Sequence, residues 1–285
     1  MEWIKRLNGA MNFIEEHIKD EIEYDEVAKI ACCSTYHFQR MFSYMADVPL
    51  SEYIRRRRMS LAAVDLQSGN EKVIDVAVKY GYDSPTAFNR AFKSVHGITP
   101  SEAKEEGTSL KAFPPISFQI TIKGESEMNY RIEKKEAFRI IGVSIPLKSE
   151  IEQNFETVPK MWAESAMNGT IPRLASMMEG TPMGLLGVSS CNECNEWRYY
   201  IAVASNKEID TTLEAFTVPE ATWAIFYGEG AGQSIQELEK RIVTEWLPTS
   251  GYEYANAPDI EVYLSEDPEQ AKYEVWIPVI KKDEA

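Results

Sequence analysis

The chain has 285 residues, of which 44% are hydrophobic and 26% charged, and its formal net charge is −15. This length suits two domains that each bury a core, and the composition is that of a soluble globular protein whose apolar runs are far too short to span a membrane. The amino-terminal residues lack the basic and apolar regions of a secretory signal, so we expect a cytoplasmic protein with no membrane contact.

The acidic side chains lie mainly in the second part of the chain. Residues 1–111 hold about 15 basic and 17 acidic side chains, whereas residues 112–285 hold about 15 and 28. DNA phosphates are contacted mainly by Lys and Arg. A DNA-binding face in the first part therefore has to come from local clustering, for which the four arginines at 55–58 are the candidate.

Residues 1–110 have the apolar spacing of helices throughout, and they contain an internal repeat. A shift of 50 residues aligns Ser34 with Ser84, Phe38 with Phe88, Arg40 with Arg90, Phe42 with Phe92, Ser51 with Ser101 and Glu52 with Glu102. In each copy a short helix, at about 24–31 and 73–80, precedes a break and a second helix that a serine caps. Two helix-turn-helix units joined by a long helix at about 51–67 are therefore predicted.

The second helix of each copy has one apolar and one polar face. Phe38, Met41 and Phe42, and in the second copy Phe88, Ala91 and Phe92, can pack onto the preceding helix. The opposite face carries Tyr36, Gln39, Arg40, Thr86, Asn89, Arg90 and Lys93. Arg suits guanine and Gln or Asn suits adenine, and two such helices could enter major-groove turns roughly 34 Å apart. Any one of these residues could be an ordinary surface residue, but the recurrence favours DNA contact.

These segments resemble the signature of the AraC/XylS family of transcription regulators. The resemblance is carried by residues 34–42, by Tyr53-Ile54-Arg55, by residues 77–84 and 88–93, and by Gly97-Ile98-Thr99-Pro100. It covers about residues 8–106 and implies promoter DNA and RNA polymerase as partners. By position it implies base contacts from Tyr36, Gln39, Arg40, Thr86, Asn89 and Arg90, to which we add Arg55 and Lys93 as DNA contacts. Pro85 departs from the family pattern, which predicts looser readout by the second unit.

A change in composition marks a second domain. Turn-rich residues at 106–109 and the Pro114-Pro115 pair predict an all-α domain over 1–110 and another domain over 111–285. Strands are predicted at 116–122, 130–132, 138–143, 198–204, 222–227, 260–264 and 273–279, and helices at about 155–167 and 234–246. This order predicts an α+β domain, a duplicated β-α-β-β unit with a curved antiparallel sheet and two helices.

The second part resembles the GyrI-like effector-binding domain of Rob-like and BmrR-like regulators. The similarity lies in residues 116–120, 128–132, 246–253 and 273–279. It implies a pocket that accepts bulky, often cationic, aromatic compounds.

Glu274 is the predicted anchor for such a cation. Period-two alternation places Glu274 and Trp276 on one face of a strand, and a carboxylate beside an indole attracts a cation by charge and by cation–π contact. Further wall residues are expected to be Trp162, Tyr199, Trp223, Phe226 and Tyr263. The alternative is that each ring belongs to the core and that Glu274 is a charge at the rim.

The combined prediction is a DNA-binding transcription regulator, an activator by resemblance, that responds to a small lipophilic effector, either cationic or neutral. Two alternatives are a GyrI-like hydrolase, in which Glu274 and Tyr199 or Tyr263 form an acid–base pair, and a module that binds a protein partner. The three histidines, His17, His37 and His96, all lie in the first part, and no Ser-His-Asp or Cys-His pattern is visible. We therefore predict no enzyme and no catalytic residue.

The four cysteines predict neither a disulfide framework nor a metal site. Cys32 and Cys33 are adjacent and are expected to be small buried fillers. Cys191 and Cys194 have the CxxC spacing, but no second Cys or His pair of matching spacing accompanies them. Two reduced thiols in a loop are favoured over a metal or redox site, and no cofactor is expected.

Overall fold

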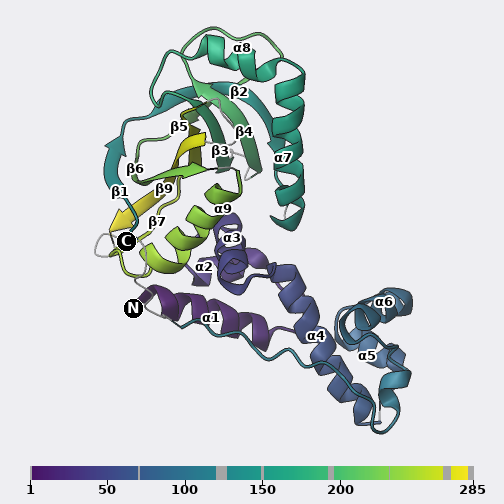
Figure 1. The fold of residues 1–285 in the computed structure, drawn as a ribbon. Helices are drawn as coiled ribbons and strands as arrows, with labels where there is room; N and C mark the ends of the chain where they lie inside the picture. Colours follow the sequence, from purple (N-terminus) through teal and green to yellow (C-terminus); the bar gives the residue numbers. More distant parts are fainter. Residues whose placement is uncertain are drawn as a thin grey trace. The chain divides into compact units, whose positions relative to one another are not determined.

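The computed structural model describes residues 2–69, 71–119, 127–148, 151–191, 196–230, 232–265 and 271–281. The chain divides into two compact units, Met1–Ile120 and Thr121–Ala285 (Figure 1). Residues 111–119, which the sequence groups with the second domain, thus belong to the first unit.

The described part of the first unit is helical, as predicted. Its helices are α1 (Glu2–Glu16), α2 (Tyr24–Ile30), α3 (Thr35–Ala46), α4 (Leu50–Gln67), α5 (Val73–Lys79) and α6 (Pro85–His96), followed by a 3-10 turn at Glu102–Lys104. The pairs α2–α3 and α5–α6 are the two helix-turn-helix units, and the long helix α4 connects them (Figure 1).

The apolar face of each second helix is buried. Phe38, Met41 and Phe42 of α3 are at most 1% exposed. In the second helix-turn-helix unit, Phe88 and Phe92 of α6 are fully buried, and their ring centres are 5.8 Å apart. Both rings join one cluster with residues of α4 and α5. Burial of one such side chain contributes about 1.5–3 kcal/mol, so these faces hold each pair of helices together.

The turns of the two units differ in detail. Ser34 caps α3, because its side chain accepts a hydrogen bond from the backbone N–H of His37 at 3.2 Å. The side chain of Ser84 makes no such cap. The predicted serine cap is therefore wrong for the second helix-turn-helix unit, where α6 begins with Pro85. Cys32 follows α2 with a φ of 55°, the left-handed conformation that Gly81 adopts after α5 with a φ of 79°.

Residues 116–119 form no strand, contrary to the prediction for 116–122. They are extended, but their backbone is bonded to side chains of the helices, such as Ile116 N–H to Tyr53 Oη at 3.2 Å. Extended sequence patterns alone cannot tell a strand from a segment that helices hold in this way. Residues 120–122 lie outside the described part.

The second unit is built on one antiparallel sheet of nine described strands. These are β1 (Tyr130–Lys135), β2 (Phe138–Pro146), β3 (Leu185–Cys191), β4 (Trp197–Ala204), β5 (Glu214–Val218), β6 (Ala221–Gly230), β7 (Tyr252–Tyr254), β8 (Asp259–Tyr263) and β9 (Ala271–Lys281). The order across the sheet is β1-β6-β9-β8-β3-β4-β2-β5, and β7 pairs with β9. The helices are α7 (Ile151–Met167), α8 (Thr170–Met177) and α9 (Gly232–Arg241), which continues as a π-helical turn at Ile242–Trp246.

The strand order confirms the predicted duplication. The first copy is β2-α7-β3-β4 and the second is β6-α9-β8-β9, so β2-β4-β3 on one side of the sheet corresponds to β6-β9-β8 on the other. The copies meet where β3 pairs with β8. Helix α8 and the strands β3, β5 and β7 were not predicted from the sequence. In β3, Gly187 and the pair Ser189-Ser190 weaken the β-branched and aromatic signal of a strand.

The two faces of the sheet carry separate apolar clusters. Tyr200, Trp223 and Trp276 lie in one cluster, and Tyr199 and Ile201 lie in the other, which α7 and α8 cover with Met161 and Leu174. Adjacent strand residues point to opposite faces, so this division decides which aromatic residues can meet.

Candidate functional site

The exposed face of α6 carries the predicted DNA-contacting residues of the second helix-turn-helix unit. Thr86, Asn89, Arg90 and Lys93 are all exposed, whereas Phe88 on the opposite side is fully buried. A helix with donors and acceptors along one exposed face can be inserted into a major groove, where these side chain types recognise bases and phosphates.

The corresponding side chains of α3 are less accessible. Gln39 and Arg40 are 4% and 8% exposed, and Tyr36 is half-buried. Arg40 folds along its own helix, with its guanidinium 5.8 Å from the centre of the Tyr44 ring and its Nε 3.5 Å from Tyr44 Oη. The expectation that this polar face is open to solvent is thus met on α6 but not for Gln39 and Arg40.

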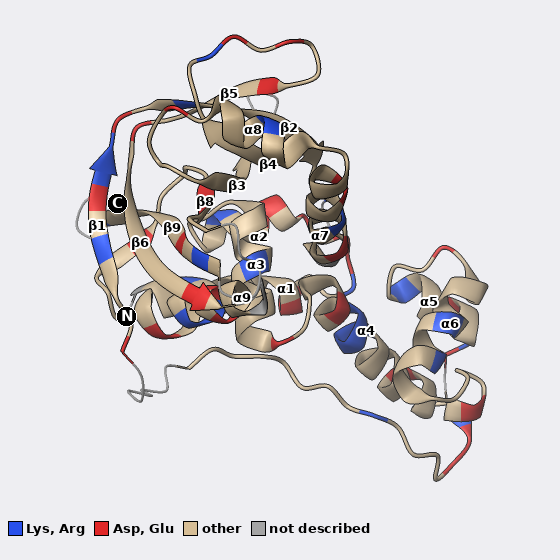
Figure 2. Cartoon of the chain, turned by 45° about the horizontal axis from the view of Figure 1, so that its top comes forward, with Lys and Arg blue, Asp and Glu red and all other residues tan. Residues whose placement is uncertain are grey.

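The four arginines at 55–58 do not form one basic patch, although basic residues are visible on α3, α4 and α6 in Figure 2. Arg55 and Arg56 both pair with Glu52, Arg57 is buried, and Arg58 donates to the backbone oxygens of residues 18 and 20. Successive helix residues point in directions about 100° apart. Only Arg55 of the four is exposed, and it stays a candidate for phosphate contact.

Arg57 forms a largely buried ion pair with Glu15 of α1. Its Nη2 lies 2.7 Å from Glu15 Oε2, and Tyr53 Oη donates to Glu15 Oε1 at 2.6 Å. Burial raises the pKa of Glu15, but the hydrogen bonds from Arg57 and Tyr53 lower it more, and the net pKa lies below its usual value. This pair joins α1 to α4 and is structural.

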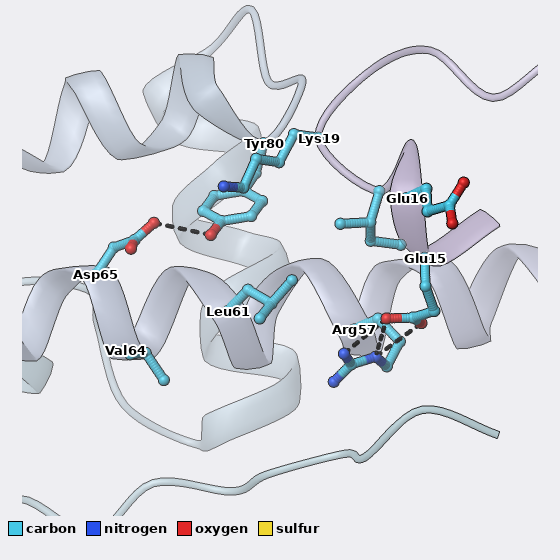
Figure 3. A pocket seen from close by; sticks show the side chains of 9 residues that line it. Glu15, Glu16, Lys19, Arg57, Leu61, Val64, Asp65 and Tyr80 are labelled. Atoms are coloured by element: carbon cyan, nitrogen blue, oxygen red, sulfur yellow. Dashed lines mark hydrogen bonds and ion pairs between the residues drawn. The ribbon is translucent and has the colours of Figure 1, made fainter. Parts of the chain in front are cut away.

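A hollow of about 420 Å³ lies beside this pair, between α1, α4 and Tyr80 (Figure 3). Two of its three carboxylates are already engaged, Glu15 by Arg57 and Asp65 by Tyr80 Oη at 2.7 Å and Lys79 Nζ at 2.9 Å. We therefore assign it no ligand.

Glu274 is not a free carboxylate in an aromatic wall. One oxygen accepts the indole N–H of Trp276 at 2.8 Å, and the other lies 2.8 Å from Arg131 Nη1. Lys135 adds a second positive charge 5.6 Å from the centre of the Trp276 ring. Glu274 is therefore already paired with Arg131, and a bound cation would have to compete with that side chain.

Three of the predicted wall residues belong to the core. Trp223 and Trp276 are at most 2% exposed, and their rings are 6.0 Å apart on the same face of the sheet. Phe226 is fully buried and packs edge-on against Trp246 at 5.0 Å. For these rings the core interpretation holds.

The other three predicted wall residues surround a different carboxylate, Glu261 of β8. Its Oε2 accepts hydrogen bonds from Tyr199 Oη at 3.1 Å and from Tyr263 Oη at 2.9 Å. Trp162 of α7 donates its indole N–H to Tyr199 Oη at 2.9 Å, and its ring meets Tyr263 edge-on at 4.9 Å. We call Glu261, Tyr199, Tyr263 and Trp162 the Glu261 cluster.

The space for this cluster comes from a glycine in the neighbouring strand. Gly187 of β3 pairs with Glu261, and a Cβ at this position would lie 2.2 Å from Tyr199 Oη and 2.7 Å from Glu261 Oε2. Burial, with a contribution from Glu261, raises the pKa of Tyr263 well above its usual value. Tyr263 therefore stays protonated and donates to the carboxylate. The cluster combines negative charge with aromatic rings, a combination that attracts organic cations.

Comparison with known proteins agrees with both halves of this description. A helix-turn-helix domain family matches residues 27–106, and the Cass2 family, described as an integron-associated effector binding protein, matches residues 131–279. The HTH-type transcriptional activator AarP of Providencia stuartii is 42% identical over 95 residues, which are 33% of this chain and 70% of that protein. The chain belongs to the AraC/XylS family. It is an AraC-type DNA-binding regulator with a GyrI-like effector-binding domain.

Other relatives extend the similarity of this AraC-type regulator. The right origin-binding protein of Escherichia coli (strain K12) is 27% identical over 268 residues, which cover 90% of this chain and 89% of that one. The crystal structure of a putative bacterial transcription regulation protein from Staphylococcus aureus MU50 has 22% identity, covers 54% of this chain and 99% of its own, and superposes with a TM-score of 0.46.

Glu261 of this AraC-type regulator was not predicted from the sequence, although a local signal was present. Glu261-x-Tyr263 repeats the pattern of Glu274-x-Trp276, a carboxylate two residues before an aromatic residue. Within each pair, the carboxylate and the aromatic ring lie on the same face of their strand. Only the register with neighbouring strands distinguishes the two pairs.

The described residues provide neither a metal site nor a membrane-spanning helix. Among the described residues, no group of three His, Cys, Asp or Glu side chains is arranged to hold a metal ion. Cys191 lies in β3, and Cys194 lies outside the described part. Of the described helices, none has the length and apolar character needed to cross a bilayer.

Proposed function

We propose that this regulator is an activator whose second unit takes up a lipophilic, aromatic cation at the Glu261 cluster. The observation that supports this most directly is the Glu261 carboxylate, which accepts hydrogen bonds from two tyrosine hydroxyls beside an apolar cluster on one face of the sheet. A poorly hydrated cation bound there gains both Coulomb attraction to the carboxylate and cation–π contact with the rings.

For DNA, we propose that α6 reads bases through Thr86, Asn89 and Arg90. Lys93 of α6 and Arg55 of α4 then contact phosphates. Their exposure and the polar types support this assignment. Tyr36, Gln39 and Arg40 are proposed as the contacts of α3, at helix positions equivalent to those on α6. Contact by Arg40 requires that its side chain leave Tyr44 and extend from the helix.

The output we propose is activation through RNA polymerase in the bacterial cytoplasm. The relative AarP is named a transcriptional activator, which favours activation over repression. Effector binding would then change the population of the state that is competent for DNA or polymerase contact.

The test replaces Glu261 with Gln, which keeps the shape and removes the charge. We expect Glu261→Gln to weaken tetraphenylphosphonium binding about tenfold or more, equivalent to about 1.4 kcal/mol or more. The neutral triphenylphosphine oxide should be affected much less. Isothermal titration calorimetry on the full chain measures both affinities.

Glu274→Gln is the matched control, because Glu274 is the same residue type on the opposite face of the sheet. It should leave both affinities within about twofold of the wild type. Equal losses for the cation and the neutral compound in Glu261→Gln would refute a charge-based site. A loss confined to Glu274→Gln would restore the prediction made from the sequence.

A further inference from the structure

Residues 108–118, which we call the strap, run in extended form beside the helices of the first unit (Figure 1). Extended chain normally satisfies its backbone groups in a sheet or with water. Here the backbone groups are bonded to side chains of three helices. The pairs are Lys111 N–H to His96 Nδ1 at 3.2 Å, Phe113 N–H to Ser60 Oγ at 3.0 Å, Ile116 N–H to Tyr53 Oη at 3.2 Å and Phe118 N–H to Asn8 Oδ1 at 2.8 Å.

Two backbone carbonyls of the strap are held as well. Asn8 Nδ2 donates to the Phe118 carbonyl at 3.0 Å, so the amide of Asn8 engages Phe118 on both sides as a neighbouring strand would. Arg57 donates through Nη1 to the Phe113 carbonyl while its other nitrogens hold Glu15. Figure 3 shows the paired side chains of Arg57 and Glu15. The strap is thus bonded to α1 and α4 through an ion pair that is itself structural.

The two ends of the strap reach different helix-turn-helix units. At one end the Phe118 ring packs edge-on against Phe42 of α3 at 6.1 Å. At the other end His96, the last residue of α6, accepts from Lys111, donates to the Met59 carbonyl and lies 4.3 Å from the Phe92 ring. Burial lowers the pKa of His96, which favours the neutral ring that these two hydrogen bonds require. Both recognition helices are therefore contacted from their core side by one stretch of chain.

In the amino-acid sequence, the effector-binding unit follows the strap. We propose that the strap holds the two recognition helices at the separation needed for two successive major-groove sites, and that effector binding alters DNA affinity by changing this hold. The inference rests on the proposed function, since it requires that α3 and α6 both enter DNA. Asn8, Tyr53, Ser60 and His96 are then positioning residues for DNA binding, although none of them contacts a base in this scheme.

The test uses the full chain and DNA fragments that the wild type selects from a random-sequence pool. The variant Asn8→Leu/Ser60→Ala removes the side chain partners of Phe118, at one end of the strap, and of Phe113, at its middle. Ser117→Ala, at an exposed strap residue, is the control. Three fragments are compared, one intact, one with two base pairs inserted between half-sites, and one with a single half-site. For the wild type we expect the insertion to cost about tenfold in affinity.

For the double variant we expect affinity for the intact fragment to fall about fivefold or more, with a smaller penalty for the insertion. Its affinity for the single half-site should stay within about twofold of the wild type. Tetraphenylphosphonium should still bind the variant, measured by calorimetry, but should no longer change its DNA affinity. Ser117→Ala should behave as the wild type.

Two results would overturn the proposed role of the strap. One is an unchanged dependence on half-site spacing together with an unchanged response to tetraphenylphosphonium. The other is an equal loss on all three fragments, which would indicate general destabilisation. Ile116→Pro, which removes one N–H donor after an existing proline, replaces the double variant if that fails to fold. If tetraphenylphosphonium does not change the DNA affinity of the wild type, the effector part of this inference fails, and calorimetry alone decides whether the proposed effector class stands. The spacing comparison still decides whether the strap positions the helices.

Discussion

Arg90 and Lys93 lie three residues apart on the exposed side of α6 but differ in what they can recognise. The planar guanidinium of Arg can bind a guanine edge with two parallel hydrogen bonds, whereas the Lys ammonium acts as a point charge suited to phosphate. Neighbouring cations on one helix are therefore expected to contribute differently to specificity and to salt dependence.

We predict that Arg90→Ala lowers affinity for the selected site by about 1–3 kcal/mol and relaxes the preference at one base pair. Lys93→Ala should weaken all sequences alike and reduce the slope of log affinity against log salt by about 1. Binding titrations at several salt concentrations, on specific and scrambled DNA, measure both effects. If both variants lose affinity equally on scrambled DNA, Arg90 contacts phosphate and is removed from the base-reading set.

At the scale of elements, the pairing of β3 with β8 assembles the Glu261 cluster. Gly187 leaves room for Tyr199 and Glu261, and Gly142 in β2 leaves room for the backbone of β4. An added Cβ at 142 would lie 2.1 Å from the Ile201 carbonyl oxygen, which cannot move without the strand. At 187 the nearest atom is the end of a tyrosine side chain, which can move.

We predict that Gly187→Ala keeps the fold but weakens tetraphenylphosphonium binding about tenfold, because Tyr199 is displaced from Glu261. Gly142→Ala, the matched control, should instead lower stability by several kcal/mol through overpacking. Urea unfolding and calorimetric titration separate the two effects. Unchanged ligand affinity in Gly187→Ala would show that the Tyr199–Glu261 contact does not serve the ligand.

At the scale of the whole molecule, each unit buries a core of its own. The second helix-turn-helix unit closes around Phe88 and Phe92, and the sheet of the other unit has clusters on both faces. Units with separate cores need not unfold in one step.

We predict two thermal transitions in scanning calorimetry of the full chain. Tetraphenylphosphonium should raise the midpoint temperature of only one of them. A ligand at 100 times its Kd stabilises the unit that binds it by about 2.7 kcal/mol. Glu261→Gln should abolish this selective shift while Glu274→Gln should retain it. A single transition that moves as a whole with ligand would mean that the two units unfold together.

The amino-acid sequence by itself determined the class of the protein. Helical spacing and the 50-residue repeat specify two helix-turn-helix units, since the period of apolar residues follows directly from helix geometry. The order of strands and helices in the second part likewise specifies a duplicated β-α-β-β unit. It also pointed to Tyr199, Tyr263 and Trp162 as pocket walls, although for a pocket at Glu274 and not at Glu261.

Only the tertiary structure decided which side chains meet. Glu261 and Glu274 have the same local pattern, but pairing with neighbouring strands places one beside two tyrosines and the other beside Arg131. Likewise the arginines at 55–58 are adjacent in sequence, but the turn of about 100° per helix residue places them at surface and buried positions. Local patterns set the face on which a residue lies, whereas register and packing between distant segments set its partners, because those contacts join residues far apart in the chain.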